Sequence, residues 1–266
     1  MVTQKYGFGE LETRALFVLE QNDTALVRTS DLGRLLKISK NHANKLVWQL
    51  VKKKRLIRIR KGVYLFAPLK AGPKGEWTEE GLLVISELLK NKPYYVSFWT
   101  ALNFYHLTEQ VPLVVQTMIT HRRRSFSAVG TKFEFITVKK LGEWREEKIG
   151  QKKIRIATIE QLLIDCLTHP EHGGGVEEAC KGLWEARKRI DYKKLGDLAQ
   201  KSPDVVQRRL GYLLEKLGLK KIKLSKKSSG WRWLDPRWPK NDYEKNEKHG
   251  LLVNISDKKL LSWMES

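Results

Sequence analysis

Three amphipathic helical patterns followed by a short hairpin fill the first quarter of the chain, and this order admits few folds. The pattern over residues 11–20 places its apolar side chains on one face of a helix. A second helix is predicted over DLGRLLKI, residues 31–38, with Thr29 or Ser30 as its N-cap. Ser39 is the predicted N-cap of a third helix, KNHANKLVWQLVKKK, whose apolar stripe consists of Ala43, Leu46, Val47 and Leu50.

A basic hairpin follows the third helix. In RLIRIRKGVYLFAP, apolar residues lie on both sides of a Lys61-Gly62 turn, and this pattern predicts two short strands joined by a tight turn. Three helices and a hairpin in this order, within about sixty residues, form a winged helix-turn-helix. We therefore expect this fold over residues 10–67.

A winged helix-turn-helix places its third helix in the major groove of DNA and its wing on the backbone. Asn bonds adenine in a bidentate manner, and Lys reaches guanine or phosphate. The groups predicted to contact bases lie at the start of the third helix: Ser39, Lys40, Asn41, His42, Asn44 and Lys45. The cations predicted to contact phosphates run from the helix end to the wing tip: Lys52, Lys53, Lys54, Arg55, Arg58, Arg60 and Lys61. The alternative is a solvated basic face on a winged helix that serves protein–protein contacts.

The charge of this region indicates a polyanionic partner. The chain holds 51 Lys and Arg residues against 30 Asp and Glu residues, a net charge of +21. Residues 1–70 alone carry 15 basic and 5 acidic residues, a net charge of +10. Nucleic acid is the commonest partner for such an excess, so double-stranded DNA is the expected ligand.

Cysteine usage and hydropathy restrict the remaining classes. Cys166 and Cys180 form neither a disulfide framework nor a zinc-binding spacing, and both are expected to be buried in a reducing compartment. No pattern calls for a metal or a cofactor. With no recognisable signal peptide and no apolar stretch of membrane length, we expect a cytoplasmic protein without a membrane partner.

The whole chain is predicted to be α+β, with the winged helix followed by a mixed α/β second domain and a basic, Trp-rich C-terminal segment. The predicted boundaries are 1–69 for the winged helix, 70–78 for a Pro/Gly linker, 79–218 for the second domain and 219–266 for the C-terminal segment. Beyond the linker, strands are predicted at 113–120, 131–138, 154–156 and 251–256, and helices at 78–91, from Ser97 onward, and at 158–168, 175–188, 191–200 and 203–217.

Cations in the second domain form a second candidate surface for nucleic acid. They occupy the loop between two predicted strands and the end of the second strand: His121, Arg122, Arg123, Arg124, Lys139 and Lys140, with Arg155 nearby. A loop of this kind binds phosphate or an acidic protein. A solvated charged turn is the alternative interpretation.

Three other clusters have a functional and a structural interpretation. One would form a site, or an aromatic core, around the helix after Ser97: Ser97, Trp99, His106 and Gln110, with Tyr94 or Tyr95. Another would bind a metal or an anion, or mark a helix stop and restart: Asp165, His169, His172 and the run Gly173–Gly175. The third would stack on unpaired bases, or pack against the second domain: Trp231, Trp233, Trp238 and Trp263.

Four segments in the same order resemble the AbiEi-type antitoxins. They are RIRKGVYLFAP, YYVSFWTALNFYHLTEQVP, IRIATIEQLLIDCLTHPEHGGGVEEA and the late LLVNIS. The resemblance covers residues 11–217 and the segment near 251. It implies a transcriptional autoregulator that binds repeats upstream of its own operon through the winged helix. It also implies that residues 78–217 counter a partner nucleotidyltransferase toxin. The long segment after 218 departs from the family pattern.

The residues leave three functions open. The first is a sequence-specific DNA-binding regulator, the antitoxin of a type IV (AbiE-like) toxin–antitoxin system, with two winged helices per operator as a dimer or as adjacent monomers. The second is an enzyme acting on DNA or RNA, a base-flipping glycosylase/AP lyase or a nuclease, for which no catalytic residue is identified. The third is a protein–protein adaptor whose winged helix is structural.

Overall fold

Strand pairing in the first quarter of the chain joins residues that are nearly forty positions apart. The computed structural model describes residues 7–22, 24, 26–67, 69, 81–89, 91–128, 131–149, 152–224 and 229–264. The predicted linker, 70–78, lies outside these residues. The chain combines helices and strands, which confirms the α+β prediction. It divides into two compact units: Met1–Pro93, Arg124–Glu134 and Lys148–Ile154 form the first, and Tyr94–Arg123, Phe135–Glu147 and Arg155–Ser266 form the second.

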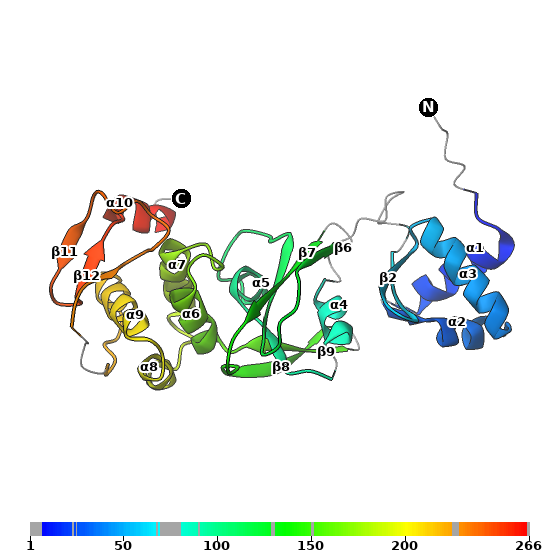
Figure 1. Cartoon of the computed structure of the whole chain (residues 1–266), viewed down its shortest axis with the longest axis horizontal. Coiled ribbons are helices and arrows are strands. Elements are labelled where there is room, and N and C mark those ends of the chain that lie inside the picture. The colour runs from blue at the N-terminus through cyan, green and yellow to red at the C-terminus, as the bar shows by residue number, and fades with distance from the viewer. Residues whose placement is uncertain are drawn as a thin grey trace, which may run out of the picture. The chain divides into compact units, whose positions relative to one another are not determined.

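The first unit contains the predicted winged helix-turn-helix (Figure 1). Its elements, in chain order, are α1 (Glu10–Gln21), β1 (Leu26–Arg28), α2 (Thr29–Leu36), α3 (Lys40–Lys52), β2 (Leu56–Arg60) and β3 (Val63–Phe66). The strands form an antiparallel sheet in the order β1-β3-β2, in which Val27 lies opposite Tyr64. Strand β1 was not predicted, because three residues are too few to show an alternation of apolar and polar side chains. Its pairing with β3 is what identifies it as a strand.

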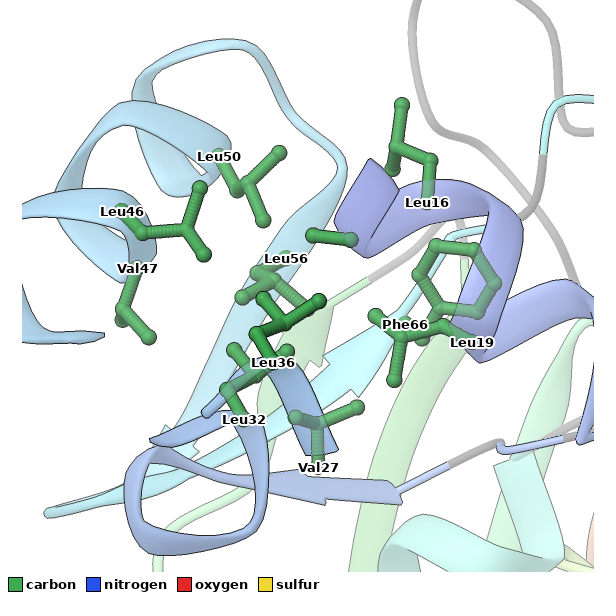
Figure 2. Close-up of a cluster of buried hydrophobic side chains, with 11 residues drawn as sticks. Leu16, Leu19, Val27, Leu32, Leu36, Leu46, Val47, Leu50, Leu56 and Phe66 are labelled. Atoms are coloured by element: carbon green, nitrogen blue, oxygen red, sulfur yellow. The ribbon is translucent and has the colours of Figure 1, made fainter. Parts of the chain in front are cut away.

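The apolar stripes of all three helices meet in one core, shown in Figure 2. Leu46, Val47 and Leu50 of α3 point into it, as the helical spacing predicts. The other labelled members come from both other helices and all three strands: Leu16, Leu19, Val27, Leu32, Leu36, Leu56 and Phe66. Because one face of α3 is used in this way, its opposite face is left to solvent.

Local chemistry sets the boundaries of α3 and of the β2–β3 hairpin. The Ser39 side chain accepts a hydrogen bond from the His42 backbone amide at 3.3 Å, which confirms the predicted cap of α3. At the wing tip Gly62 has φ 74°, a left-handed conformation that favours glycine. For α2 the expectation was wrong: the helix begins at Thr29, and its N-cap is Arg28, which makes no side-chain capping bond.

Beyond the winged helix, six strands form a mixed sheet. Their order is β6-β7-β5-β4-β9-β8, with bounds Tyr94–Val96 (β4), Val114–Ile119 (β5), Phe126–Ala128 (β6), Thr131–Thr137 (β7), Trp144–Ile149 (β8) and Lys152–Ala157 (β9). Helix α4 (Gly81–Leu88) belongs to the first unit. Strand β8, WREEKI, escaped prediction because it is an edge strand with mostly exposed side chains and so lacks an apolar alternation.

The second unit continues with helices and a small terminal sheet. The helices are α5 (Phe98–Phe104), α6 (Ile159–Thr168), α7 (Val176–Ala186), α8 (Tyr192–Gln200) and α9 (Asp204–Lys216). The sheet has the order β10-β12-β11, with bounds Arg232–Trp233 (β10), Glu244–Asn246 (β11) and Leu251–Val253 (β12), and it is followed by α10 (Asp257–Leu260) and a short 3-10 helix, η2 (Ser262–Met264). Within the described ranges, no helix is both long and apolar enough to cross a membrane.

A carboxylate from the C-terminal segment caps helix α7. Asp235 is fully buried and accepts a hydrogen bond from the Val176 backbone amide at 2.9 Å and from the Arg237 guanidinium. Arg237 also bonds Glu177 at 2.7 Å, and a Cβ on Gly175 would collide with its guanidinium. The absence of a side chain at Gly175 therefore leaves room for the Arg237 guanidinium. The Val176 amide at the start of α7 donates to the Asp235 carboxylate, which occupies the position predicted for an external anion.

Candidate nucleic-acid interface

The outer face of α3 is polar and exposed. Asn41, Asn44, Lys45 and Lys52 are all exposed, and their spacing of three, four and seven or more residues puts them on the side opposite the core stripe. Lys40 is exposed as well. Amide and ammonium groups are the donors and acceptors that match base edges and phosphates. The helix thus presents the predicted chemistry on one continuous face.

Trp48 lies on the same face and was missing from the predicted site. Its side chain is 63% exposed, and the Lys52 ammonium lies 5.3 Å from the centroid of its ring. Trp48 follows Asn41 by seven residues and Lys45 by three, so the helical period places all three together. That spacing was the available signal. It was overlooked because tryptophan is usually assigned to a core.

The cap of α3 uses two of the predicted base-contacting residues. Ser39 Oγ lies 3.1 Å from His42 Nδ1 and also accepts the His42 backbone amide. Both side chains are exposed at the helix N-terminus. Their mutual bond occupies one ring nitrogen of His42, so its other ring nitrogen remains for an external partner.

The wing divides its arginines between two roles. Arg58 and Lys61 are exposed, and no ion pair is found for either within the described ranges. Arg60 instead bonds the Glu87 carboxylate of α4 at 2.5 Å, and Arg28 lies 3.6 Å from the same oxygen. The Glu87 side chain, which is only 5% exposed, thus neutralises both cations beside the wing turn.

The structure corrects two predicted phosphate contacts. Arg55 is buried, with 6% of its surface exposed, because β2 begins beside it and its carbonyl pairs with the Ala67 amide. It cannot reach a phosphate from this position. Lys53 folds back onto α1, where its ammonium bonds the Glu12 carboxylate at 2.5 Å and the Gly7 carbonyl at 2.7 Å. Lys54, by contrast, is exposed, with a left-handed φ of 56°.

The second basic surface is only partly assembled. The Val138 amide donates to the Ile119 carbonyl at 2.8 Å, so the segments that carry His121 and Lys139 leave the sheet side by side. The exposed members of the set are Arg122, Arg124, Lys139 and Lys140. Arg123 lies over the Phe135 ring at 5.2 Å, and burial lowers its pKa. Arg123 is therefore a packing residue.

Asp165 lies at the centre of a buried polar network. It accepts hydrogen bonds from Ser97 Oγ at 2.7 Å, Gln161 Nε2 at 2.7 Å and Tyr95 Oη at 3.0 Å. Burial raises the pKa of Asp165 to about 6, and these three donors limit the rise. The network connects α6 to β4. Ser97 and Tyr95, which were candidates for a separate site, both donate to Asp165.

The remaining clusters named above agree with their structural interpretations. Helix α5 ends at Phe104, so His106 lies beyond it with φ 55°, exposed, and does not share a face with Trp99. His172 packs on the Phe98 ring, with centroids 5.4 Å apart. No group of three His, Cys, Asp or Glu side chains that would hold a metal occurs in the described part of the chain.

The two tyrosines named as possible members of a site around the helix after Ser97 are inside the protein. Tyr94 and Tyr95 are 4% and 1% exposed. Tyr94 lies under the Arg155 guanidinium at 5.6 Å, and Tyr95 bonds Asp165. Neither ring is accessible to a nucleobase in this structure.

Fold and surface together define an α+β protein whose first unit is a winged helix-turn-helix with a polar, cationic outer face on α3. No protein-family model matches the chain, and no curated protein is similar to it in sequence. Among solved structures it is similar to the crystal structure of RV2827C protein from Mycobacterium tuberculosis, with a TM-score of 0.65 and 14% identity. That similarity covers 98% of this chain and 96% of the other. At this identity it shows the fold alone.

Proposed function

We propose that this protein is a sequence-specific DNA-binding transcriptional regulator. The proposal depends on the outer face of α3, where Asn41, Asn44 and Lys45 are exposed. The opposite face of this helix packs in the core, and Ser39 caps its N-terminus. Asn41 and Asn44 would bond adenine edges in the major groove, and Lys45 would reach guanine or phosphate. Trp48 would add an apolar contact to a thymine methyl group or a deoxyribose.

Exposed cations around this face would hold the duplex backbone. Lys40, Lys52, Lys54, Arg58 and Lys61 are all exposed on α3, on the segment after it, or on the wing. Phosphate contacts of this kind add affinity without sequence choice. The base contacts of α3 would then supply the preference for one operator.

The resemblance to AbiEi-type antitoxins extends the proposal. In that setting the protein would bind repeats upstream of its own operon in the cytoplasm. Its second unit would counter a nucleotidyltransferase toxin encoded beside it. Two copies per operator would read the repeats, because one recognition helix covers few base pairs.

Replacing Asn41 and Lys45 together tests sequence reading. We expect Asn41→Ala with Lys45→Ala to weaken binding to a duplex from the upstream region about 10- to 100-fold, because each good base contact contributes roughly 1–3 kcal/mol of discrimination. Binding to a scrambled duplex of equal length should fall much less. Fluorescence anisotropy at fixed salt measures both.

A matched control keeps the charge change but moves it. Lys188 is exposed in the second unit, and Lys188→Ala removes one positive charge, as Lys45→Ala does; it should leave the preference for the upstream duplex intact. An equal loss of affinity on specific and scrambled duplexes in the α3 variant would mean that α3 contacts only phosphate. No binding to any duplex by the wild-type protein would refute the proposal outright.

The wing is tested by the salt dependence of binding. Arg58→Gln with Lys61→Gln should flatten the slope of log K against log salt by about 0.9 for each lost phosphate contact. Arg60→Gln is the matched comparison on the same hairpin, because Arg60 is already paired with Glu87. An unchanged slope in the Arg58/Lys61 variant would remove the wing from the interface.

A further inference from the structure

The four tryptophans of the C-terminal segment have two different roles. Trp238 donates to the Glu177 carboxylate at 2.9 Å, with the Lys259 ammonium 3.5 Å from its ring centroid. Trp263 donates to the Leu260 carbonyl at 3.1 Å. Both are half-buried and anchor the segment by packing. Trp231 and Trp233 make no comparable hydrogen bond through their indoles among the described residues.

Strand register places these two tryptophans on the outer face of the small terminal sheet. Trp233 lies opposite Leu252, and Leu252 lies opposite Lys245, so these three side chains form one row across β10, β12 and β11. Trp231 lies directly before β10 and Tyr243 directly before β11, and ring contacts place both on this side: the Tyr243 ring lies 5.2 Å from that of Trp233, and the Lys245 ammonium lies 5.9 Å from that of Trp231. The next row contains Leu251, which is fully buried, so the inner face already supplies the core.

Two exposed aromatic rings and one half-buried ring lie together on this side. Trp231 is 39% exposed and Tyr243 is 43% exposed, while Trp233 is half-buried with the Tyr243 ring edge-on at a centroid distance of 5.2 Å. We call Trp231, Trp233 and Tyr243 the aromatic face. Figure 1 shows its strands β11 and β12 at the C-terminal end of the second unit, close to α10.

Lysines flank the aromatic face. The Lys240 ammonium lies 5.9 Å from the Trp233 ring centroid, and the Lys245 ammonium lies 5.9 Å from that of Trp231. The acidic neighbour Glu244 is paired with Val253 and so points to the opposite side of the sheet. There it lines a cleft of about 670 Å³ with Asp242. Tyr243 and Lys245 also line this cleft, so Lys240 and Lys245 are assigned to the aromatic face by their contacts with the Trp233 and Trp231 rings.

Two buried arginines hold the backbone beneath the rings. Arg208 Nη1 donates to the Gly230 and Gly250 carbonyls at 2.7 and 2.8 Å, on either side of the β10–β12 pair. Arg209 donates to the Trp233 carbonyl at 3.2 Å and to the Leu167 carbonyl at 2.7 Å. The rings consequently project from a fixed scaffold, and little conformational freedom would be lost when a ligand binds.

We propose that the aromatic face binds unpaired bases of single-stranded nucleic acid. Bases would stack on Trp231 and Trp233, and Lys240 and Lys245 would contact the intervening phosphates. Aromatic rings interleaved with cations are the combination that single-strand binding requires, because every base has a π-face and every linkage a negative charge. This activity is separate from duplex binding through α3 and the wing.

The test uses the full-length protein and two fluorescein-labelled oligonucleotides of equal length, oligo(dT) and oligo(rU). Trp231→Ala with Trp233→Ala should weaken binding by at least about fivefold for each lost stack. Trp231→Phe with Trp233→Phe should retain most of the affinity. The two probes distinguish DNA from RNA as the source of the strand.

Further variants separate this site from the duplex site. The Trp231/Trp233 alanine variant should bind the upstream duplex like the wild type, and Asn41→Ala with Lys45→Ala should bind oligo(dT) like the wild type. Lys240→Glu with Lys245→Glu leaves both tryptophan rings in place and should also weaken single-strand binding. This variant keeps the inference testable if the tryptophan-to-alanine variant does not fold. Wild-type protein that binds neither oligonucleotide, or equal binding by all variants, would overturn the inference.

Discussion

Identical side chains in the winged helix do different work according to their neighbours. Arg58 is exposed, whereas Arg60, two residues later, bonds the buried carboxylate of Glu87. Lys52 lies over Trp48, whereas Lys53 bonds Glu12. A charge count assigns all four to DNA. The acidic partners come from α1 and α4, which are remote in the chain, so only the folded structure separates available cations from neutralised ones.

At the residue scale, Asp165 predicts a pH dependence of stability. Its pKa in the folded protein is raised to about 6 from 3.8. Between these values the folded state keeps a proton that the unfolded chain releases, so this group's contribution is present below about pH 4 and is lost as pH rises towards 6. We expect Asp165→Asn to gain about 3 kcal/mol relative to the wild type between pH 4 and pH 7. Urea unfolding at a series of pH values measures this.

Asp197→Asn is the control for that series. Asp197 is exposed on α8, so its replacement should shift unfolding by a constant, small amount across the same range. If the Asp165→Asn curve runs parallel to the wild-type curve, the carboxylate is ionised in both states and the network of Tyr95, Ser97 and Gln161 neutralises the effect of burial.

At the element scale, the cap of α3 links stability to binding. Ser39→Ala removes the acceptor of the His42 amide and should cost about 1 kcal/mol of unfolding free energy. Ser39→Asp supplies another capping oxygen, and its negative charge interacts favourably with the positive N-terminal end of the helix dipole. Its unfolding free energy should therefore equal that of the wild type. Its negative charge would face the phosphates, so duplex binding should still fall. Thermal unfolding and anisotropy together separate the two effects.

An outcome in which Ser39→Asp binds the duplex as tightly as the wild type would mean that the N-terminus of α3 lies away from the backbone. The same position thus tests the orientation of the helix without changing Asn41 or Lys45. A loss of stability in Ser39→Asp equal to that of Ser39→Ala would instead show that the hydroxyl, and no other acceptor, fits the cap.

Elements differed in how far their sequences predicted them. Helix α3, its cap and the wing turn follow from periodicity and turn chemistry, and α6 lies within the predicted range 158–168, where the Thr158 side chain accepts the Gln161 amide at 3.3 Å. Strands β1 and β8 were missed, since one has three residues and the other is an exposed edge. Both depend on a neighbouring strand for definition.

At the scale of the whole molecule, Asp235 connects the C-terminal segment to α7 by accepting a hydrogen bond from the Val176 amide. Burial raises the pKa of Asp235, but bonds from Arg237 and the Val176 amide hold it below its ordinary value. Asp235→Ala would leave Arg237 and that amide without their acceptor, so we expect a loss of about 3 kcal/mol and faster proteolysis of the segment. Asp242→Ala, exposed in the same segment, should change neither measurement.

Unfolding of the Asp235→Ala variant, followed by tryptophan fluorescence, checks this prediction. Trp238 and Trp263 report on the anchored segment, since both pack within it. Unchanged protease resistance would show that Arg208 and Arg209 hold the segment without the carboxylate.

The sequence by itself determined the α+β class, the winged helix, the cap of α3 and the polar outer face of that helix, because helical period, caps and turns are properties of neighbouring residues. The tertiary structure decided which cations stay exposed, that Asp235 caps α7, that Asp165 accepts hydrogen bonds from Tyr95 and Ser97, and that Trp231 is exposed while the Trp238 indole donates to Glu177. Each of these depends on a partner tens of residues away. Local sequence patterns do not specify which distant carboxylate, carbonyl or strand will contact a given residue in the folded protein.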